Sequence, residues 1–72
     1  MEFTQVISTT VAEVAYEKDT LYIRFTNGRL YKYDDVPKEL YHNLINAESI
    51  GKFFHGYIKR NFVCTELPRE TV

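Results

Sequence analysis

The pair Asn27-Gly28 stands between two short segments in which apolar and polar residues alternate. This alternation, over Leu21–Phe25 and again over Leu30–Tyr33, predicts two half-buried strands. Asn-Gly between such segments is the strongest short-range signal for a β-hairpin, because both residues tolerate the positive φ of tight turns. The sequence therefore predicts an antiparallel hairpin near the middle of the chain.

The length of the hairpin loop decides which side chains share a face, because a slip of one residue turns every side chain over. A two-residue loop would place Lys32 on the apolar face of the first strand. A three-residue loop over 26–28, with Gly28 left-handed, places Tyr31 and Tyr33 there instead. Burying a lysine costs more, so we expect the three-residue loop. The opposite face then carries a mixed set of side chains, namely Tyr22, Arg24, Leu30 and Lys32.

Further strands are expected on both sides of this hairpin. Residues 11–16 are β-prone, and 17–19 form a charged turn. One side of this strand is expected to carry Ala12, Val14 and Tyr16. Residues 1–7 are interpreted as an edge strand or a loosely attached arm. Residues 62–64 predict a short returning strand, and 68–72 a frayed tail.

Two helices are expected between the hairpin and the returning strand. Pro37 suits the first helical position of helix one, and Asp34 and Asp35 favour the positive end of its dipole. The apolar stripe of helix one is Leu40, Tyr41, Leu44 and Ile45. Ser49 is a good N-cap for helix two, and Asn61 a plausible C-cap. The stripe of helix two is Ile50, Phe53, Phe54, Tyr57 and Ile58. The predicted fold class is α+β: a small antiparallel sheet, then two packed helices and a short C-terminal strand.

Composition limits the chain to one domain, residues 1–72, with 44% hydrophobic and 15% aromatic residues. The formal net charge of −1 gives no whole-chain signal for nucleic acid. The single cysteine, Cys64, favours a reducing, cytoplasmic compartment. Neither a signal peptide nor a membrane span is expected from the sequence. The sequence does not indicate an oligomeric state.

An ordered set of short motifs resembles the KTSC domain family, over about residues 8–67. The set is Val14-Ala15-Tyr16, Leu21 to Phe25, Gly28, Tyr31-Lys32-Tyr33, Val36-Pro37, Tyr41, Ser49-Ile50-Gly51, Phe53-Phe54, Ile58 and Phe62. The family is named for the C-terminus of some lysyl-tRNA synthetases and also occurs as stand-alone bacterial or phage proteins. The resemblance implies no catalytic residues, and through the synthetases it suggests RNA as a ligand.

Motifs for catalysis, cofactors or metals are not found in the sequence. His42, His55 and Cys64 are too few for a metal site and lack a ligand spacing. Cys64 is expected to be a buried, inert thiol, and we expect no enzyme. Gly51 would permit close packing of helix two, or alternatively the approach of a phosphate to its backbone. Packing is the preferred interpretation for Gly51, and Gly56 is expected to be similar.

Basic residues cluster in the hairpin and in helix two, whereas acidic residues lie in turns and at the ends. Basic side chains beside a stackable ring are typical of single-stranded RNA binding, although an ordinary solvated face has the same composition. The leading hypothesis is a non-catalytic RNA-binding module. Its expected contacts are Tyr22, Arg24, Arg29 and Lys32, extended by Lys52, Lys59 and Arg60 if helix two lies near that face. The alternative is an accessory factor of phage or prophage type that docks on a host protein.

Overall fold

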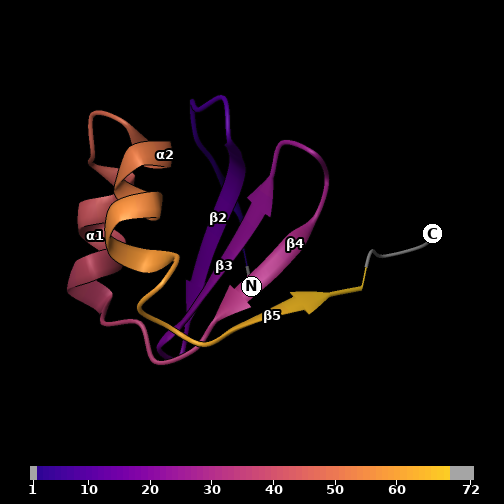
Figure 1. Cartoon of the computed structure of the whole chain (residues 1–72), viewed down its shortest axis with the longest axis vertical. Coiled ribbons are helices and arrows are strands. Elements are labelled where there is room, and N and C mark those ends of the chain that lie inside the picture. The colour runs from indigo at the N-terminus through magenta and orange to yellow at the C-terminus, as the bar shows by residue number, and fades with distance from the viewer. Residues whose placement is uncertain (1, 69–72) are drawn as a thin grey trace.

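The hairpin around Asn27-Gly28 forms the middle of a five-stranded antiparallel sheet, in a computed structural model that describes residues 2–68 (Figure 1). The strands lie side by side in chain order from β1 to β5. They are β1 (Thr4–Gln5), β2 (Val11–Glu17), β3 (Thr20–Phe25), β4 (Leu30–Tyr33) and β5 (Cys64–Leu67). The predicted N-terminal segment thus contributes a two-residue edge strand, and the C-terminal strand forms the other edge.

The three-residue hairpin loop is confirmed. Gly28 has a φ of 91°, and the Phe25 amide donates to the Arg29 carbonyl at 2.8 Å. In the ladder that follows, Tyr31 lies opposite Ile23 and Tyr33 opposite Leu21. Because side chains alternate across a strand, these tyrosines share the core face, and Lys32 lies on the other face with its partner, Tyr22.

A β-bulge changes the expected face of β2. Val11 pairs with Phe25 and Glu13 with Arg24, so Ala12 is the extra residue. The prediction that Ala12 lies on the core side with Val14 and Tyr16 is therefore wrong at its first residue. The bulge turns Val11 into the core in its place, where its side chain is fully buried.

The helices lie together on one side of the sheet (Figure 1). They are α1 (Lys38–Ile45), α2 (Ile50–Phe53) and η1 (Phe54–Ile58), a π-helical turn that continues α2. Helices and sheet enclose one hydrophobic core. Its buried members are Val11, Val14, Leu21, Ile23, Tyr33, Val36, Leu44, Ile50, Phe54 and Ile58. The predicted α+β class is confirmed by this arrangement.

Helix α1 begins one residue later than predicted. Pro37 has an extended ψ of 144° and precedes the helix as its N-cap residue, so its assignment to the first helical position is wrong. Its carbonyl accepts from the amides of Leu40 and Tyr41. Asp34 and Asp35 lie before the cap, and the acidic residue of the first turn is Glu39. The predicted apolar stripe of α1 does face the core, with Leu44 fully buried.

Ser49 caps α2 as predicted, because its Oγ accepts from the Lys52 amide at 3.3 Å. The single long amphipathic helix, however, is interrupted by the π-turn, in which the Lys59 amide donates to the Phe54 carbonyl. The wider turn changes the angular spacing, so Tyr57 leaves the predicted stripe and is 58% exposed.

The returning strand begins at Cys64, two residues later than predicted. It is an edge strand, so one side of its backbone has no neighbouring strand within residues 2–68. Cys64 is exposed, which contradicts the expectation of a buried thiol. Of the predicted tail, 69–72 lies outside the described residues. No helix within residues 2–68 has the length and apolar character needed to cross a bilayer.

Candidate functional site

The face of the sheet that points away from the helices carries three of the predicted contacts, Tyr22, Arg24 and Lys32. Tyr22 is partly exposed between the two cations in the ladder. Each cation, however, has an acidic partner. Arg24 Nε lies 3.0 Å from Glu13 Oε1, and Lys32 Nζ lies 3.6 Å from Asp34 Oδ1. Their charge is thus largely compensated, which lowers the attraction of this face for phosphate.

Arg24 also makes a cation–π contact with Phe3. Its guanidinium carbon lies 5.3 Å from the centroid of the Phe3 ring, a cation–π distance. An RNA phosphate would have to compete with both Phe3 and Glu13 for this side chain.

Arg29 lies on the opposite, helix-covered side of the sheet, at its uncovered margin. Its Nε lies 4.0 Å from Glu66 Oε2, and the Tyr31 hydroxyl donates to Glu66 Oε1 at 3.4 Å. The Arg29 side chain is 57% exposed, so this ion pair is weak and open to water. Arg29 therefore does not join Arg24 and Lys32 in one surface.

Lys52, Lys59 and Arg60 are exposed; Lys52 lies in α2, and Lys59 and Arg60 directly follow η1. Because these helices cover the other side of the sheet (Figure 1), the three residues do not extend the open sheet face. Within residues 2–68, no carboxylate lies within ion-pair distance of any of these three side chains. They are the predicted contacts whose charge remains available to a ligand.

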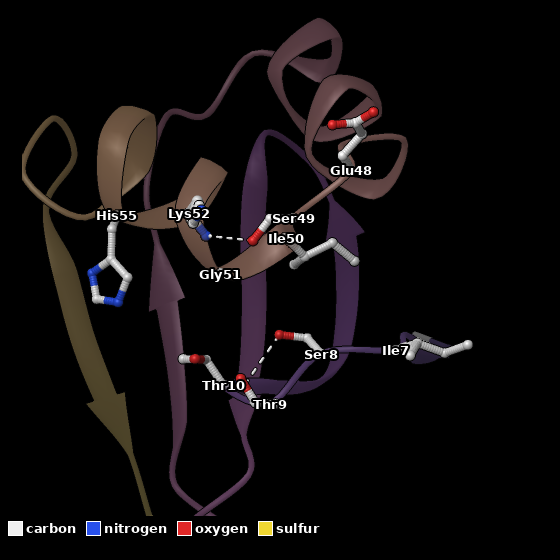
Figure 2. Close-up of a pocket in the computed structure, with 10 residues that line it drawn as sticks. All are labelled: Ile7, Ser8, Thr9, Thr10, Glu48, Ser49, Ile50, Gly51, Lys52 and His55. Atoms are coloured by element: carbon white, nitrogen blue, oxygen red, sulfur yellow. Dashed lines mark hydrogen bonds between the residues drawn. The ribbon is translucent and has the colours of Figure 1, made fainter.

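A hollow of about 310 Å³ lies between the first turn of α2 and the loop before β2 (Figure 2). The hydroxyl-bearing loop Ser8–Thr10 lies across from Ser49 and Gly51, while Lys52 and His55 come from successive helical turns. Ser8 Oγ is already occupied, because it accepts from the amides of Thr10 and Val11.

Gly51 lies where the loop before β2 approaches the first turn of α2 closely. A β-carbon built at Gly51 would lie 3.3 Å from Thr10 Oγ1, which supports the packing interpretation. At Gly56 a β-carbon would meet nothing within 4 Å, so the expectation that Gly56 resembles Gly51 is wrong.

A second hollow, which we call the aromatic groove, lies between η1 and strands β4 and β5 and has a volume of about 300 Å³. Four of its lining residues are aromatic, and the others are His55, Lys59 and Cys64. The aromatic members are Phe25, Tyr31, Tyr33 and Phe54. Phe25 packs edge-to-face on Tyr31 and on Phe54, with centroid distances of 5.5 and 5.4 Å.

His55 lines both hollows, so they adjoin. Lys52, His55 and Lys59 follow one another along the helix and form a row that we call the helix-two strip. Lys52 lines the first hollow, Lys59 lines the aromatic groove, and His55 lies between them in the chain. Sequence reasoning named both lysines but missed His55 and the groove, because only the fold brings η1 beside Tyr31.

Burial raises the pKa values of Tyr33 and Tyr16. Loss of solvation raises the pKa of the Tyr33 hydroxyl well above its usual value, with smaller contributions from Cys64 and Tyr31. Desolvation also raises the pKa of Tyr16, with Asp19 adding to the effect. The Tyr16 hydroxyl donates to the Val36 carbonyl, and its ring stacks on Tyr41 at 5.0 Å. Both side chains are thus structural, including Tyr33 at the base of the groove.

Metal-binding side chains do not gather anywhere in the described part of the chain. Within residues 2–68 there is no group of three histidine, cysteine or acidic side chains that could share an ion. The first hollow is lined by hydroxyl groups, Lys52, His55 and one carboxylate, that of Glu48, whereas the aromatic groove is lined by aromatic rings, His55, Lys59 and Cys64.

The sheet, its single helical layer and the two adjoining hollows define a small α+β domain with an aromatic groove and a cationic rim. The chain belongs to the KTSC domain family, whose model matches residues 7–62. The crystal structure of a KTSC domain protein from Yersinia pestis superposes with a TM-score of 0.89 at 32% identity, covering 93% of this chain and 97% of that one.

Relatives include stand-alone proteins and parts of larger ones. A protein of Tsukamurella paurometabola is 45% identical over 42 residues, which is 58% of this chain and 63% of that protein. A lysine–tRNA ligase of Trichormus variabilis is 37% identical over 59 residues, which is 79% of this chain but 10% of the ligase. The chain thus spans less than two thirds of the length of the Tsukamurella protein and about a tenth of the length of the ligase.

Proposed function

We propose that this chain is a non-catalytic module that binds single-stranded RNA along the helix-two strip. The observation that carries the proposal is that Lys52 and Lys59 are exposed and have no acidic partner within residues 2–68. Lys59 lines the groove with aromatic walls, and Lys52 lines the hollow that adjoins it. Cations that track the backbone and rings that stack on bases are the two elements of single-strand recognition.

The charge balance of the hairpin supports the strip over the open sheet face. Binding a phosphate to Arg24 or Lys32 would require competition with Glu13 or Asp34, whereas the strip lysines gain a partner without losing one. Released counterions then supply most of the binding free energy. The open face remains the second surface to test, with Tyr22 as its stacking ring.

The relatives support RNA as the ligand class. Two of them are lysine–tRNA ligases, from Trichormus variabilis and from a Nostoc species, and proteins of that name act on an RNA. A segment similar to this chain is therefore found in proteins that handle RNA. The proposal also implies the cytoplasm, where RNA is present and a free thiol such as Cys64 stays reduced.

The test is a fluorescence titration of a single-stranded RNA at about 50 mM and about 200 mM salt. The variant is Lys52→Gln/Lys59→Gln, and the matched control is Lys18→Gln/Lys38→Gln, which removes the same charge from exposed sites elsewhere. Each lost phosphate contact should lower the slope of log K against log salt by about 0.7. We expect the strip variant to bind more weakly with a shallower slope, and the control to keep the wild-type slope.

Three results would count against this proposal. They are absence of RNA binding by the folded wild type, binding that ignores salt, and equal effects of the strip variant and its control. Loss of binding only in Arg24→Gln/Lys32→Gln would move the interaction to the open sheet face.

A second candidate function is protein docking, as an accessory factor of phage or prophage type. It is favoured by the outer edge of β5, which has no neighbouring strand within residues 2–68 and could accept an extended segment of a partner. Val63, just before that strand, is 70% exposed. A complex with a host protein that survives nuclease treatment, combined with no RNA binding, would favour this candidate.

A further inference from the structure

We propose that the aromatic groove accepts one unpaired nucleobase of the bound RNA, stacked against Tyr31, with the adjoining phosphate on Lys59. This inference rests on the proposed RNA binding. It assigns a ligand, one nucleobase, to the aromatic groove.

The Tyr31 ring has no parallel aromatic partner within residues 2–68. Tyr31 is half-buried, and its one ring neighbour within residues 2–68 is Phe25, which meets it edge-to-face at an interplanar angle of 79°. By contrast, Tyr16 and Tyr41 lie nearly parallel, at 13°, and occupy each other's faces. Tyr31 therefore has a ring without a parallel partner at the margin of a groove, which is what a stacking platform requires.

The aromatic groove is small and has mainly aromatic walls. A volume of about 300 Å³ is at the lower end for ligand pockets, so the groove suits a single base better than a larger ligand. The buried rings of Phe54 and Tyr33, 5.5 Å apart and edge-to-face, form a rigid apolar back wall. Such a wall contacts any base without selecting among the four.

Two polar side chains, His55 and Lys59, line the helical side of the groove. His55 lies in the π-turn and Lys59 directly follows it, and π-turns are frequent at functional sites. On the sheet side, the Tyr31 hydroxyl donates to Glu66 Oε1. The phosphate next to a base on Tyr31 would meet Lys59, which lines the same groove.

The experiment compares an octamer of adenylates with an abasic ribose–phosphate octamer of the same length. Contacts to phosphate alone predict equal affinity, whereas stacking in the groove predicts tighter binding of the adenylate octamer, by at least about fivefold. Tyr31→Leu keeps an apolar side chain against Phe25 and should remove the difference. Tyr22→Leu, a tyrosine on the opposite face of the neighbouring strand, should keep it. Circular dichroism and thermal melting show that each variant is folded.

The outcomes separate the two proposals. Equal affinity of the wild type for both octamers overturns the groove assignment and leaves RNA binding standing, since phosphates are still bound. Loss of the difference in Tyr22→Leu but not in Tyr31→Leu also overturns it. Failure of the wild type to bind either octamer overturns both proposals. If Tyr31→Leu does not fold, NMR amide shifts of the wild type on adding the adenylate octamer test the assignment. Shifts concentrated at Tyr31, His55 and Lys59 would support it. Absence of selective shifts at these three residues would refute binding of a base in the groove.

Discussion

Gly51 and Gly56 offer a matched pair of substitutions within one continuous helical segment. Neither has a positive φ, so alanine fits the backbone at both positions. Alanine is about 1 kcal/mol more favourable than glycine in a helix. At Gly56 the new methyl group would meet nothing within 4 Å, so Gly56→Ala should gain most of that amount.

At Gly51 the same methyl group would lie 3.3 Å from Thr10 Oγ1 and 3.5 Å from Thr10 Cβ. The first distance is shorter than an ordinary van der Waals contact, and forcing atoms into a packed site costs about 1–3 kcal/mol. This cost offsets or exceeds the gain in helix propensity. Gly51→Ala should therefore be less stable than Gly56→Ala by at least about 1 kcal/mol.

Urea unfolding followed by circular dichroism measures both variants, with the m value as a check on two-state behaviour. For a domain of this size, 1 kcal/mol corresponds to a shift of about 4–8 °C in Tm. Adding Thr10→Ala should remove part of the penalty at Gly51, because the nearest atom is then absent. Equal stabilisation by Gly51→Ala and Gly56→Ala would refute the packing argument for the α2 start.

Two further predictions concern titratable side chains. Burial raises the pKa of Tyr33, so above about pH 10 the unfolded chain loses the proton while the folded chain keeps it, and stability should fall as pH rises. Urea unfolding between pH 8 and 11 should show this fall, and Tyr33→Phe should reduce it; an unchanged slope in the variant would contradict the assignment. Cys64 is exposed, so Ellman's reagent should modify it in the native protein as fast as in urea, and strong native protection would contradict the exposed edge strand.

Local signals predicted the elements that depend on neighbouring residues. The Asn27-Gly28 turn and the alternation beside it were sufficient for the correct hairpin register, because a buried lysine excluded the other one. Ser49 was recognisable as a cap, since its side chain needs only the amide of Lys52 three residues later. In each case the deciding contact lies within one turn or one hairpin.

The errors arose where distant residues or backbone irregularities decide the position of a side chain. The bulge at Ala12 and the π-turn that exposes Tyr57 each change a periodicity that the sequence pattern continues unbroken. Cys64 looked like part of a buried apolar segment, but the edge position of β5 exposes it. No local pattern distinguishes these cases from regular strands and helices.

The sequence by itself determined the fold class, the hairpin register and the sheet face on which Arg24 and Lys32 lie. The pairing of Lys32 with Asp34 joins residues two apart in the chain, so it is a local contact. Only the tertiary structure decided that Arg24 pairs with Glu13 across two strands, whereas Lys59 meets no acid within residues 2–68. It also decided where a groove exists. The physical reason is that charge compensation and concavity depend on distances between separate elements, and these distances are set by packing.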